Sequence, residues 1–441
     1  MSAAAPFGPN TLTWLLGIED TCVYPTHSTM SPLDEHVLTE HHLNWREDLT
    51  LLQELGATAV RYGVSWPVVH TAPNEFDWTV LDETIAFAVD ELGLTIVADL
   101  VHYGTPQWLS DSFADPRYPI AIESFSREFA TRYHGKVNHF TPLNEPVTTA
   151  SFCGLRGVWP PARTGWEGWV AVAVPIAIGM VRTTRAIREA NPNAVIVHVE
   201  ASILVDADDS HLADHATLLK DVGWLPTDLM MGRVAADDRR WLWLLDNGAD
   251  RKDLEWLVQN AVSPDIIGVN YYPDLTPRHL ESVEGHTMQI SYDRWTAGLR
   301  QAITAFATRY GLPMVVTETS IEGTDQTREA WLRDSVAEIQ QLVSEGIDIR
   351  GYTWWPLFDF VDWSWAAGGA NVEEFAVVRA LSDGSTSVGR APSLGDPANG
   401  KTPFLRRMGL VRLEEQADGS LARQSTPAAL AFLELTCGDS S

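Results

Sequence analysis

The sequence predicts an α/β fold, a (β/α)8 TIM barrel that forms a single domain over residues 1–441, with long loops after strands 5 and 8. Eight short apolar runs alternate with longer stretches of helical periodicity, which favours an all-parallel sheet closed into a barrel. Polar residues stand at the carboxyl ends of several runs, the face that carries the active site in this fold. No Gly-x-Gly-x-x-Gly loop follows an early run, which argues against a doubly wound open sheet.

The predicted strands are short apolar runs rich in Val, Ile and aromatic residues. In chain order they are Leu12–Ile18, Ala59–Ser65, Thr95–His102, Asn138–Leu143, Ala194–Val199, Ile266–Tyr271, Met314–Thr317 and Ile349–Trp355. The predicted helices lie between and after them and repeat apolar residues at helical spacing. They are Asn44–Leu55, Val80–Leu92, Ile120–Tyr133, Trp166–Ala190, Tyr292–Tyr310, Thr327–Ser344 and Pro427–Leu435.

Two regions interrupt this alternation. Residues 205–262 follow the fifth strand and are predicted to form a long helical excursion with a Trp-rich helix around Trp241–Trp256. Residues 366–404 follow the eighth strand and are rich in Gly, Ala, Ser, Pro and Asp. Because loops longer than about 12–15 residues are usually functional or disordered, we predict that 366–404 is an inserted, mobile flap over the mouth of a pocket.

Composition limits the class of partner. The chain is 45% hydrophobic, which is enough for a large core, and its formal net charge is −28, from 59 acidic and 31 basic residues. Such a surface repels nucleic acid and anionic membranes and fits a neutral or cationic ligand. We therefore expect no nucleic-acid partner and no membrane partner. The 18 tryptophans suit core filling and the stacking of sugar rings equally well.

Cysteine usage and the first residues predict a cytoplasmic location. Cys22, Cys153 and Cys437 are irregularly spaced, so they form neither a disulfide framework nor a metal motif. Residues 1–10 lack a basic segment followed by an apolar run, so no signal peptide is expected. The longest apolar stretch, Val170–Met180, is too short to span a bilayer.

Two glutamates follow buried runs and predict the chemistry. One run ends in Thr-Pro-Leu-Asn-Glu-Pro, which places Glu145 at a strand end, and another ends in Val-Val-Thr-Glu-Thr-Ser, which does the same for Glu318. Two carboxylates presented from two strand ends are the minimal equipment for cleaving a glycosidic bond with retention of configuration. We expect Glu145 to act as acid and then base, and Glu318 to act as nucleophile.

Neighbouring side chains fit that chemistry. Asn144 could hold the sugar 2-hydroxyl, a contact that strengthens in the transition state. Arg61 is the expected partner that keeps Glu318 ionised, with Tyr272 as a second. His102 stands at a strand end, where it could bind a sugar hydroxyl.

Several of these residues have a purely structural alternative, and His102 could be a satisfied packing histidine. Glu145 could be a solvated strand-end carboxylate, and Arg61 could belong to an ion pair inside the barrel. Each tryptophan near the eighth strand could be core filler as well as a stacking platform. The pair His41-His42 lies in a polar segment without further ligand spacing, so no metal is expected.

Together these residues resemble family 1 glycoside hydrolases, the β-glucosidase family, over nearly the whole chain. The acid/base motif of that family reads Thr-Phe/Leu-Asn-Glu-Pro and its nucleophile motif reads Ile/Val-Thr-Glu-Asn-Gly. Further similar segments are Arg61 to Pro67, His102 to Leu109, Gly154 to Pro161, Ile267 to Tyr272, Trp355 to Trp363 and Arg407 to Val411. The resemblance implies a (β/α)8 barrel, retaining hydrolysis of β-linked glycosides and no cofactor.

The chain also departs from the family pattern. Thr319-Ser320 replaces Asn-Gly after the nucleophile, and Tyr103 replaces Trp after His102. The glutamate that grips the sugar 4- and 6-hydroxyls is replaced by Asp362, which is one methylene shorter, and Glu19 is the candidate replacement for an N-terminal glutamine. These changes predict a sugar that differs from an unmodified glucoside at C4 or C6.

The interpretation is a divergent, retaining β-glycosidase that acts on a small β-glycoside or short oligosaccharide. The resemblance implies that the first sugar subsite is built by Arg61, His102, Asn144, Asn270, Tyr272, Trp355, Asp362, Trp363 and Glu19. A transglycosidase on the same site, a catalytically idle carbohydrate-binding barrel and an endo-acting polysaccharide hydrolase are the alternatives. The sequence leaves the aglycone and the oligomeric state open.

Overall fold

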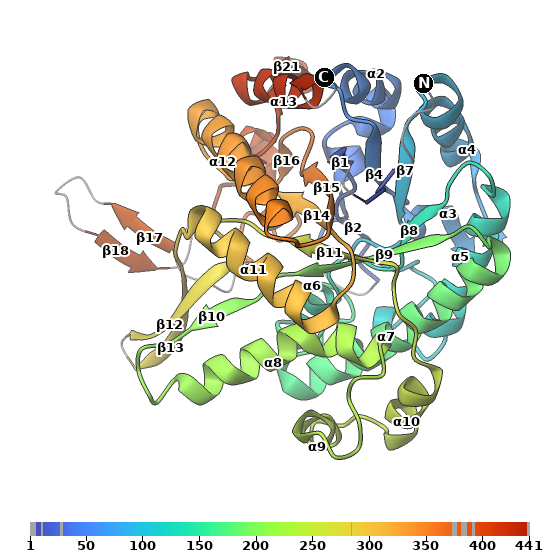
Figure 1. Cartoon of the computed structure of the whole chain (residues 1–441), viewed down its shortest axis with the longest axis vertical. Coiled ribbons are helices and arrows are strands. Elements are labelled where there is room, and N and C mark those ends of the chain that lie inside the picture. The colour runs from blue at the N-terminus through green and yellow to red at the C-terminus, as the bar shows by residue number, and fades with distance from the viewer. Residues whose placement is uncertain are drawn as a thin grey trace.

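The computed structural model describes residues 6–9, 12–26, 30–283, 285–372, 377–380, 386–389 and 393–438. Eight parallel strands close into a barrel in the order β1-β15-β14-β11-β9-β8-β7-β4, which confirms the predicted fold class (Figure 1). They are β1 (Thr13–Ile18), β4 (Ala59–Gly63), β7 (Thr95–Asp99), β8 (His139–Thr141), β9 (Val195–Ala201), β11 (Ile266–Asn270), β14 (Met314–Thr319) and β15 (Ile349–Trp354). Each lies within or near a run that the sequence analysis identified as a strand.

Seven predicted helices are present on the outside of the barrel. They are α2 (His41–Glu54), α4 (Thr79–Ala86), α5 (Tyr118–Arg132), α7 (Gly165–Ala190), α11 (Trp295–Tyr310), α12 (Asp325–Ser344) and α13 (Pro427–Gly438). The helix predicted to end at Leu92 changes to a π-helical turn over Phe87–Glu91, where the Leu92 N–H donates to the carbonyl of Phe87. α7 is long and apolar enough to cross a bilayer, but 72% of its apolar window is buried inside the molecule.

The region after β9 is more divided than the sequence predicts. It contains β10 (Leu204–Asp206), α8 (Ala213–Met230), α9 (Arg239–Asp246) and α10 (Arg251–Asn260). The prediction of one Trp-rich helix around Trp241–Trp256 is wrong, because Gly248 adopts a φ of 94° and Asp250 caps a new helix by accepting from the Lys252 N–H. A hairpin of β12 (Pro277–Val283) and β13 (His286–Ser291), absent from the predicted elements, joins β10 in a small sheet.

The segment after β15 contains a hairpin of β17 (Val377–Ala380) and β18 (Thr386–Gly389), which projects from the body of the molecule (Figure 1). Short strands flank it, β16 (Phe360–Val361) before and β19 (Leu405–Arg406) after. The predicted flap includes residues 373–376, 381–385 and 390–392, which lie outside the described residues. It therefore stays a prediction.

The interior of the barrel contains a layer of apolar side chains and, nearer the carboxyl ends of the strands, a layer of polar side chains. Leu15, Ala59 and Val97 belong to a small buried cluster together with Val197, Val199 and Val315. Because side chains two residues apart share a face, Arg61 and Asp99 lie one layer above Ala59 and Val97. The polar layer is therefore at the carboxyl end of the barrel.

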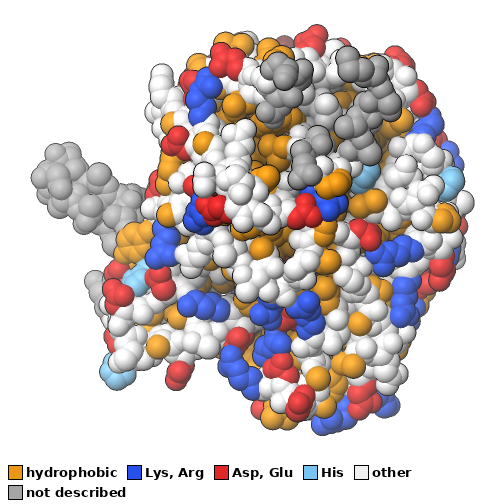
Figure 2. Space-filling view, viewed as in Figure 1, with side chains coloured by type: hydrophobic (Ala, Val, Ile, Leu, Met, Phe, Trp, Pro, Cys, Tyr) orange, Lys and Arg blue, Asp and Glu red, His pale blue; other side chains and the backbone are white. Residues whose placement is uncertain are grey.

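The surface mixes both signs of charge. On the face in Figure 2, basic side chains gather mostly in the lower half, with acidic side chains among them. Several arginines of the molecule are paired with acidic side chains; for example, Arg188 on α7 lies 3.0 Å from Asp265, and Arg239 on α9 pairs with Asp221.

Candidate active site

A polar cluster occupies the carboxyl ends of the barrel strands, with Arg61 at its centre. Nη1 of Arg61 donates to Oε1 of Glu318 at 2.8 Å and lies 2.7 Å from Oε1 of Glu19. Its Nη2 donates to Oδ2 of Asp99 at 3.2 Å and to Oδ1 of Asn144 at 3.0 Å. Burial by itself lowers the pKa of Arg61. The charges of the surrounding carboxylates raise it by more, so the pKa lies above its ordinary value. The guanidinium thus joins side chains from several strands into one network.

Glu318 lies at the end of β14 and is 3% exposed. Its Oε1 accepts from Arg61, and its Oε2 accepts from the hydroxyl of Tyr272 at 2.7 Å. Burial raises the pKa of Glu318 to about 7; Arg61 opposes this rise, whereas the charge of Glu145 adds to it. A carboxylate with a cationic partner and such a pKa remains largely ionised in mildly alkaline solution.

Glu145 stands between β8 and α6 (Pro146–Ala150) in the left-handed region, at φ 42°. Non-glycine residues adopt this conformation at some cost, and it is enriched at functional sites. Oε1 of Glu145 accepts from Nδ2 of Asn270 at 2.7 Å, and Oε2 accepts from the hydroxyl of Tyr103 at 2.7 Å. Among the described residues, neutral donors therefore hold Glu145, whereas a cation holds Glu318.

A second set of contacts fixes the residues behind the two glutamates. Nδ1 of His102 lies 2.8 Å from Oδ2 of Asp99, and Nδ2 of Asn144 lies 3.2 Å from Nε2 of His102. Nδ2 of Asn144 also donates to the hydroxyl of Tyr103 at 3.1 Å. Although burial lowers it, the pKa of His102 is raised overall by the hydrogen bond and charge of Asp99.

A pocket of about 80 Å³ opens between the two glutamates. Seven of the predicted site residues line it, namely His102, Glu145, Tyr272, Glu318, Trp355, Asp362 and Trp363. The buried Nε1 of Trp363 has no hydrogen-bond partner in the described part of the chain, so it remains available to a ligand. The pocket thus combines aromatic walls with polar groups, as expected for a sugar site.

The other predicted site residues do not line the pocket between the two glutamates. Arg61 and Asn144 are fully buried behind it, and Asn270 lines a neighbouring cavity. Glu19 is also fully buried and contacts Arg61, and its contact with a sugar stays a prediction. Burial raises the pKa of Glu19 well above its ordinary value.

Asp362 lines the pocket, but protein groups hold its carboxylate. Oδ1 accepts from the Ser364 N–H at 2.8 Å, and Oδ2 accepts from Nη1 of Arg406 at 3.0 Å. Nε of Arg406 donates to Glu322 at 2.8 Å. The shorter side chain is therefore anchored to the pocket wall.

Sequence reasoning missed six residues of the site, namely Asp99, Tyr103, Leu275, Phe360, Arg406 and Met408. Tyr103 was noted only as a departure from the family pattern, and its φ of 68° marks another strained position. Asp99 ends β7, and a carboxylate that closes an apolar strand was an available signal. Leu275, Phe360 and Met408 line the pocket, but single apolar residues outside the barrel strands carry no comparable signal.

No group of three or more His, Cys, Asp or Glu residues able to hold a metal ion occurs among the described residues.

Comparisons with known proteins agree with this architecture. The model of Glycosyl hydrolase family 1 matches residues 17–273 and 269–370. Beta-glucosidase 4 of Oryza sativa is 24% identical over 389 residues, covering 74% of this chain and 78% of that protein. The aryl-phospho-beta-D-glucosidase BglC of Bacillus subtilis is 23% identical over 397 residues, covering 76% and 81%.

The fold of a solved family member is also similar. The family 1 beta-glucosidase of Thermotoga maritima superimposes with a TM-score of 0.76 at 15% identity, covering 99% of each chain. This similarity concerns the fold alone, whereas the family match covers most of the sequence and includes both glutamate segments. The chain is a glycoside hydrolase and belongs to glycosyl hydrolase family 1.

Proposed function

We propose that the enzyme is a retaining β-glycosidase in which Glu318 is the nucleophile and Glu145 the acid/base. The observation that carries the proposal is the difference between their partners: Arg61 contacts Glu318, whereas Tyr103 and Asn270 contact Glu145. A nucleophile must stay ionised, and a nearby cation favours that state. An acid/base must gain and lose a proton, and neutral donors permit both forms.

Two displacements account for the reaction. In the first, an oxygen of Glu318 bonds to the anomeric carbon as the bond to the leaving oxygen breaks, and Glu145 transfers its proton to that oxygen. In the second, Glu145 takes a proton from water as the water oxygen bonds to the anomeric carbon, and the carboxylate of Glu318 leaves. Each displacement inverts the carbon, so the product keeps the β configuration.

The proposed sugar is neutral. Arg406 is the one arginine in the wall of the sugar pocket as described, and Asp362 and Glu322 already hold it. A phosphorylated sugar would have to compete with those two carboxylates. The enzyme should therefore hydrolyse aryl β-glycosides in preference to their 6-phospho derivatives, and a preference for the phosphorylated series would contradict this assignment.

Proton NMR of the first product tests the stereochemistry. The initial sugar should be the β-anomer, and a separation of about 5–5.5 Å between the two carboxyl groups is expected in a ligand complex. An α-anomer formed first would overturn the retaining mechanism.

Truncation variants test the two roles. Glu318→Ala should abolish turnover of every glycoside. Glu145→Ala should impair substrates with poor leaving groups far more than activated aryl glycosides, because acid assistance matters less when the leaving group is already stable. Azide should rescue Glu145→Ala and yield a β-glycosyl azide. Equal losses on both kinds of substrate would contradict the acid/base role of Glu145.

A further inference from the structure

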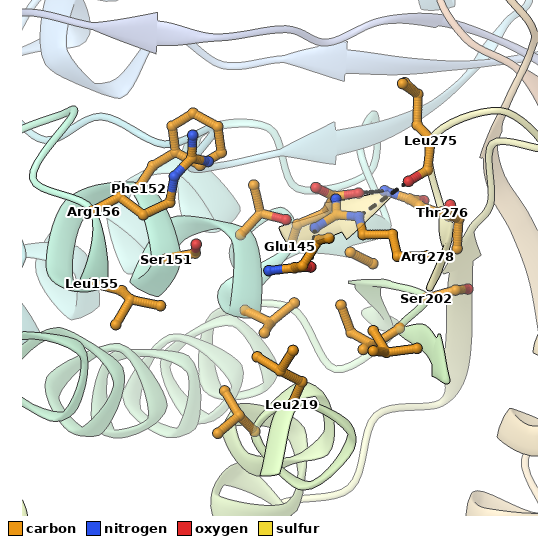
Figure 3. A pocket seen from close by; sticks show the side chains of 18 of the residues that line it. Glu145, Ser151, Phe152, Leu155, Arg156, Ser202, Leu219, Leu275, Thr276 and Arg278 are labelled. Atoms are coloured by element: carbon orange, nitrogen blue, oxygen red, sulfur yellow. Dashed lines mark hydrogen bonds between the residues drawn. The ribbon is translucent and has the colours of Figure 1, made fainter. Parts of the chain in front are cut away.

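A larger cavity lies beside the sugar pocket. Its volume is about 200 Å³, and Figure 3 shows side chains that line it from the helical segment after Glu145, from α8 and from the chain around Ser202. Much of its lining is apolar and includes Val147, Phe152, Leu155, Ile203, Leu219 and Val222. An apolar cavity of about 150 Å³ is sufficient to bind benzene, so this space can enclose a larger hydrocarbon group.

The cavity meets the sugar pocket at the acid/base. Glu145, Tyr272, Leu275 and Trp363 line both spaces. Glu318, in contrast, lines the sugar pocket but not the side cavity. Since the acid protonates the leaving oxygen, the group attached to that oxygen must lie on the Glu145 side. The cavity is therefore placed to receive the leaving group.

The two arginines of the cavity do not suit a charged leaving group, and its neutral polar side chains, such as Thr148, Ser151 and Gln289, are a minority of the lining. Arg156 donates to the carbonyl of Val372 and packs over the ring of Phe152, and Arg278 donates to the side chain of Gln289 at 3.2 Å. Both bases are thus engaged within the protein. A second sugar would bring several hydroxyls that need partners, and burying them without partners is costly.

Besides Nε1 of Trp363, which lines both spaces, one further buried polar atom of the cavity lacks a partner. The hydroxyl of Ser202 is buried, with the residue 5% exposed, and has no hydrogen-bond partner among the described residues. It stands where β9 leads into β10 and can bind a single oxygen of an otherwise apolar group. Close packing helps to shape this wall, because a Cβ added to Gly223 on α8 would lie 2.6 Å from Ile203.

We propose that the natural aglycone is an uncharged, largely hydrocarbon alcohol, aliphatic or isoprenoid, that is enclosed in this side cavity during cleavage. The proposal rests on the proposed function, because it assigns the leaving group of the same reaction. It goes further in naming a substrate class and the residues that select it. The selectivity should come from Leu219, Val222 and Ile203, which line the cavity far along the chain from the catalytic glutamates.

A series of alkyl β-glycosides tests the proposal. With the sugar that the wild type prefers, kcat/KM should rise about fourfold for each methylene from methyl to octyl, as expected for burial of apolar surface. The octyl glycoside should also exceed the corresponding disaccharide. Equal kcat/KM values from the methyl to the octyl glycoside, or a clear preference for the disaccharide, would overturn the proposal.

Variants on α8 connect the effect to the cavity. Leu219→Trp should lower kcat/KM for the octyl glycoside at least tenfold and leave the methyl glycoside within about twofold. Thr217→Trp introduces the same side chain at an exposed position of the same helix and should leave both values unchanged. Leu219→Asn introduces polarity without added volume and should also lower the octyl value selectively. Equal losses for octyl and methyl glycosides in both Leu219 variants would overturn the assignment.

A binding measurement separates this proposal from the proposed function. Calorimetry with 1-octanol should show binding to the wild type and to Glu318→Gln, and weaker binding to Leu219→Trp. If the wild type hydrolysed no aryl β-glycoside but showed this pattern, the proposed reaction would fail while the apolar cavity site stood. If it hydrolysed aryl glycosides but did not bind 1-octanol, the cavity proposal alone would fail.

Discussion

Arg61 and the two carboxylates that share its Nη1 control the ionisation of the site. Because burial raises the pKa of Glu318 to about 7, kcat/KM should fall as the pH drops below about 7 and the nucleophile gains a proton. Arg61→Gln removes the group that opposes this rise. The acidic limb of the pH profile should then move to higher pH by about one to three units.

Glu19→Gln is the matched control for Arg61→Gln, because Glu19 contacts the same guanidinium. Burial raises the pKa of Glu19 well above its ordinary value, which favours the protonated form that glutamine reproduces. The acidic limb should stay in place, and kcat/KM should change less than about threefold, on the order of 0.7 kcal/mol. A limb that moves as far in Glu19→Gln as in Arg61→Gln would show that Glu19 is ionised in the working enzyme.

Asp362 provides a second prediction at the residue scale. Its carboxylate is held against the pocket wall by Ser364 and Arg406. Asp362→Glu extends the side chain by about 1.5 Å, the length of one C–C bond, and should increase the preference for simple β-glucosides. The measurement is kcat/KM on gluco, galacto, fuco, manno and xylo aryl glycosides. A wild type that already prefers the glucoside strongly, together with an unchanged variant, would contradict the argument from side-chain length.

At the scale of elements, the β17–β18 hairpin projects from the barrel and does not belong to the barrel sheet (Figure 1). Replacing residues 374–392 with a short Gly-Ser linker should therefore change the melting temperature by less than a few degrees. Limited proteolysis of the wild type should cut within 366–404, and a bound inhibitor should slow the cut if the segment acts as a flap. A strongly lowered melting temperature would show that the segment is structural.

The elements also show what the sequence could predict. Strand alternation and helical periodicity are local signals, so all eight barrel strands could be located, and with them Glu145 and Glu318. The partners of these glutamates are not local signals: Tyr103 is 42 residues from Glu145, and its role depends on how two strand ends meet. The β12–β13 hairpin was missed although Gly285, with a φ of 80°, marks its turn.

At the scale of the whole molecule, an excess of buried carboxylates affects stability. Burial raises the pKa of Asp20 to about 6 and that of Glu318 to about 7. It also raises the pKa values of Glu19, Glu35 and Glu200. A carboxyl group whose pKa is higher in the folded state contributes stability below its unfolded pKa, and this contribution is lost as the pH rises through the folded pKa.

The enzyme should therefore melt at a higher temperature near pH 5.5 than near pH 8. The net charge of −28 acts in the same direction, because deprotonation adds to self-repulsion. Calorimetry across this range at constant ionic strength measures the trend. Glu200→Gln should reduce the slope, since the amide can still accept from the Val147 N–H and donate to the hydroxyl of Thr227. A melting temperature that rises towards pH 8 would contradict this prediction.

The side cavity also has a consequence for the lifetime of the covalent intermediate. An alcohol that is slow to leave the cavity stays beside Glu145 while the sugar is attached to Glu318, and it excludes water from the same space. Return of the sugar to that alcohol then competes with hydrolysis, so the partition ratio between transfer and hydrolysis should depend on the apolar volume that the alcohol fills. In water saturated with 1-octanol, the enzyme would then work as a catalyst of alkyl glycoside synthesis.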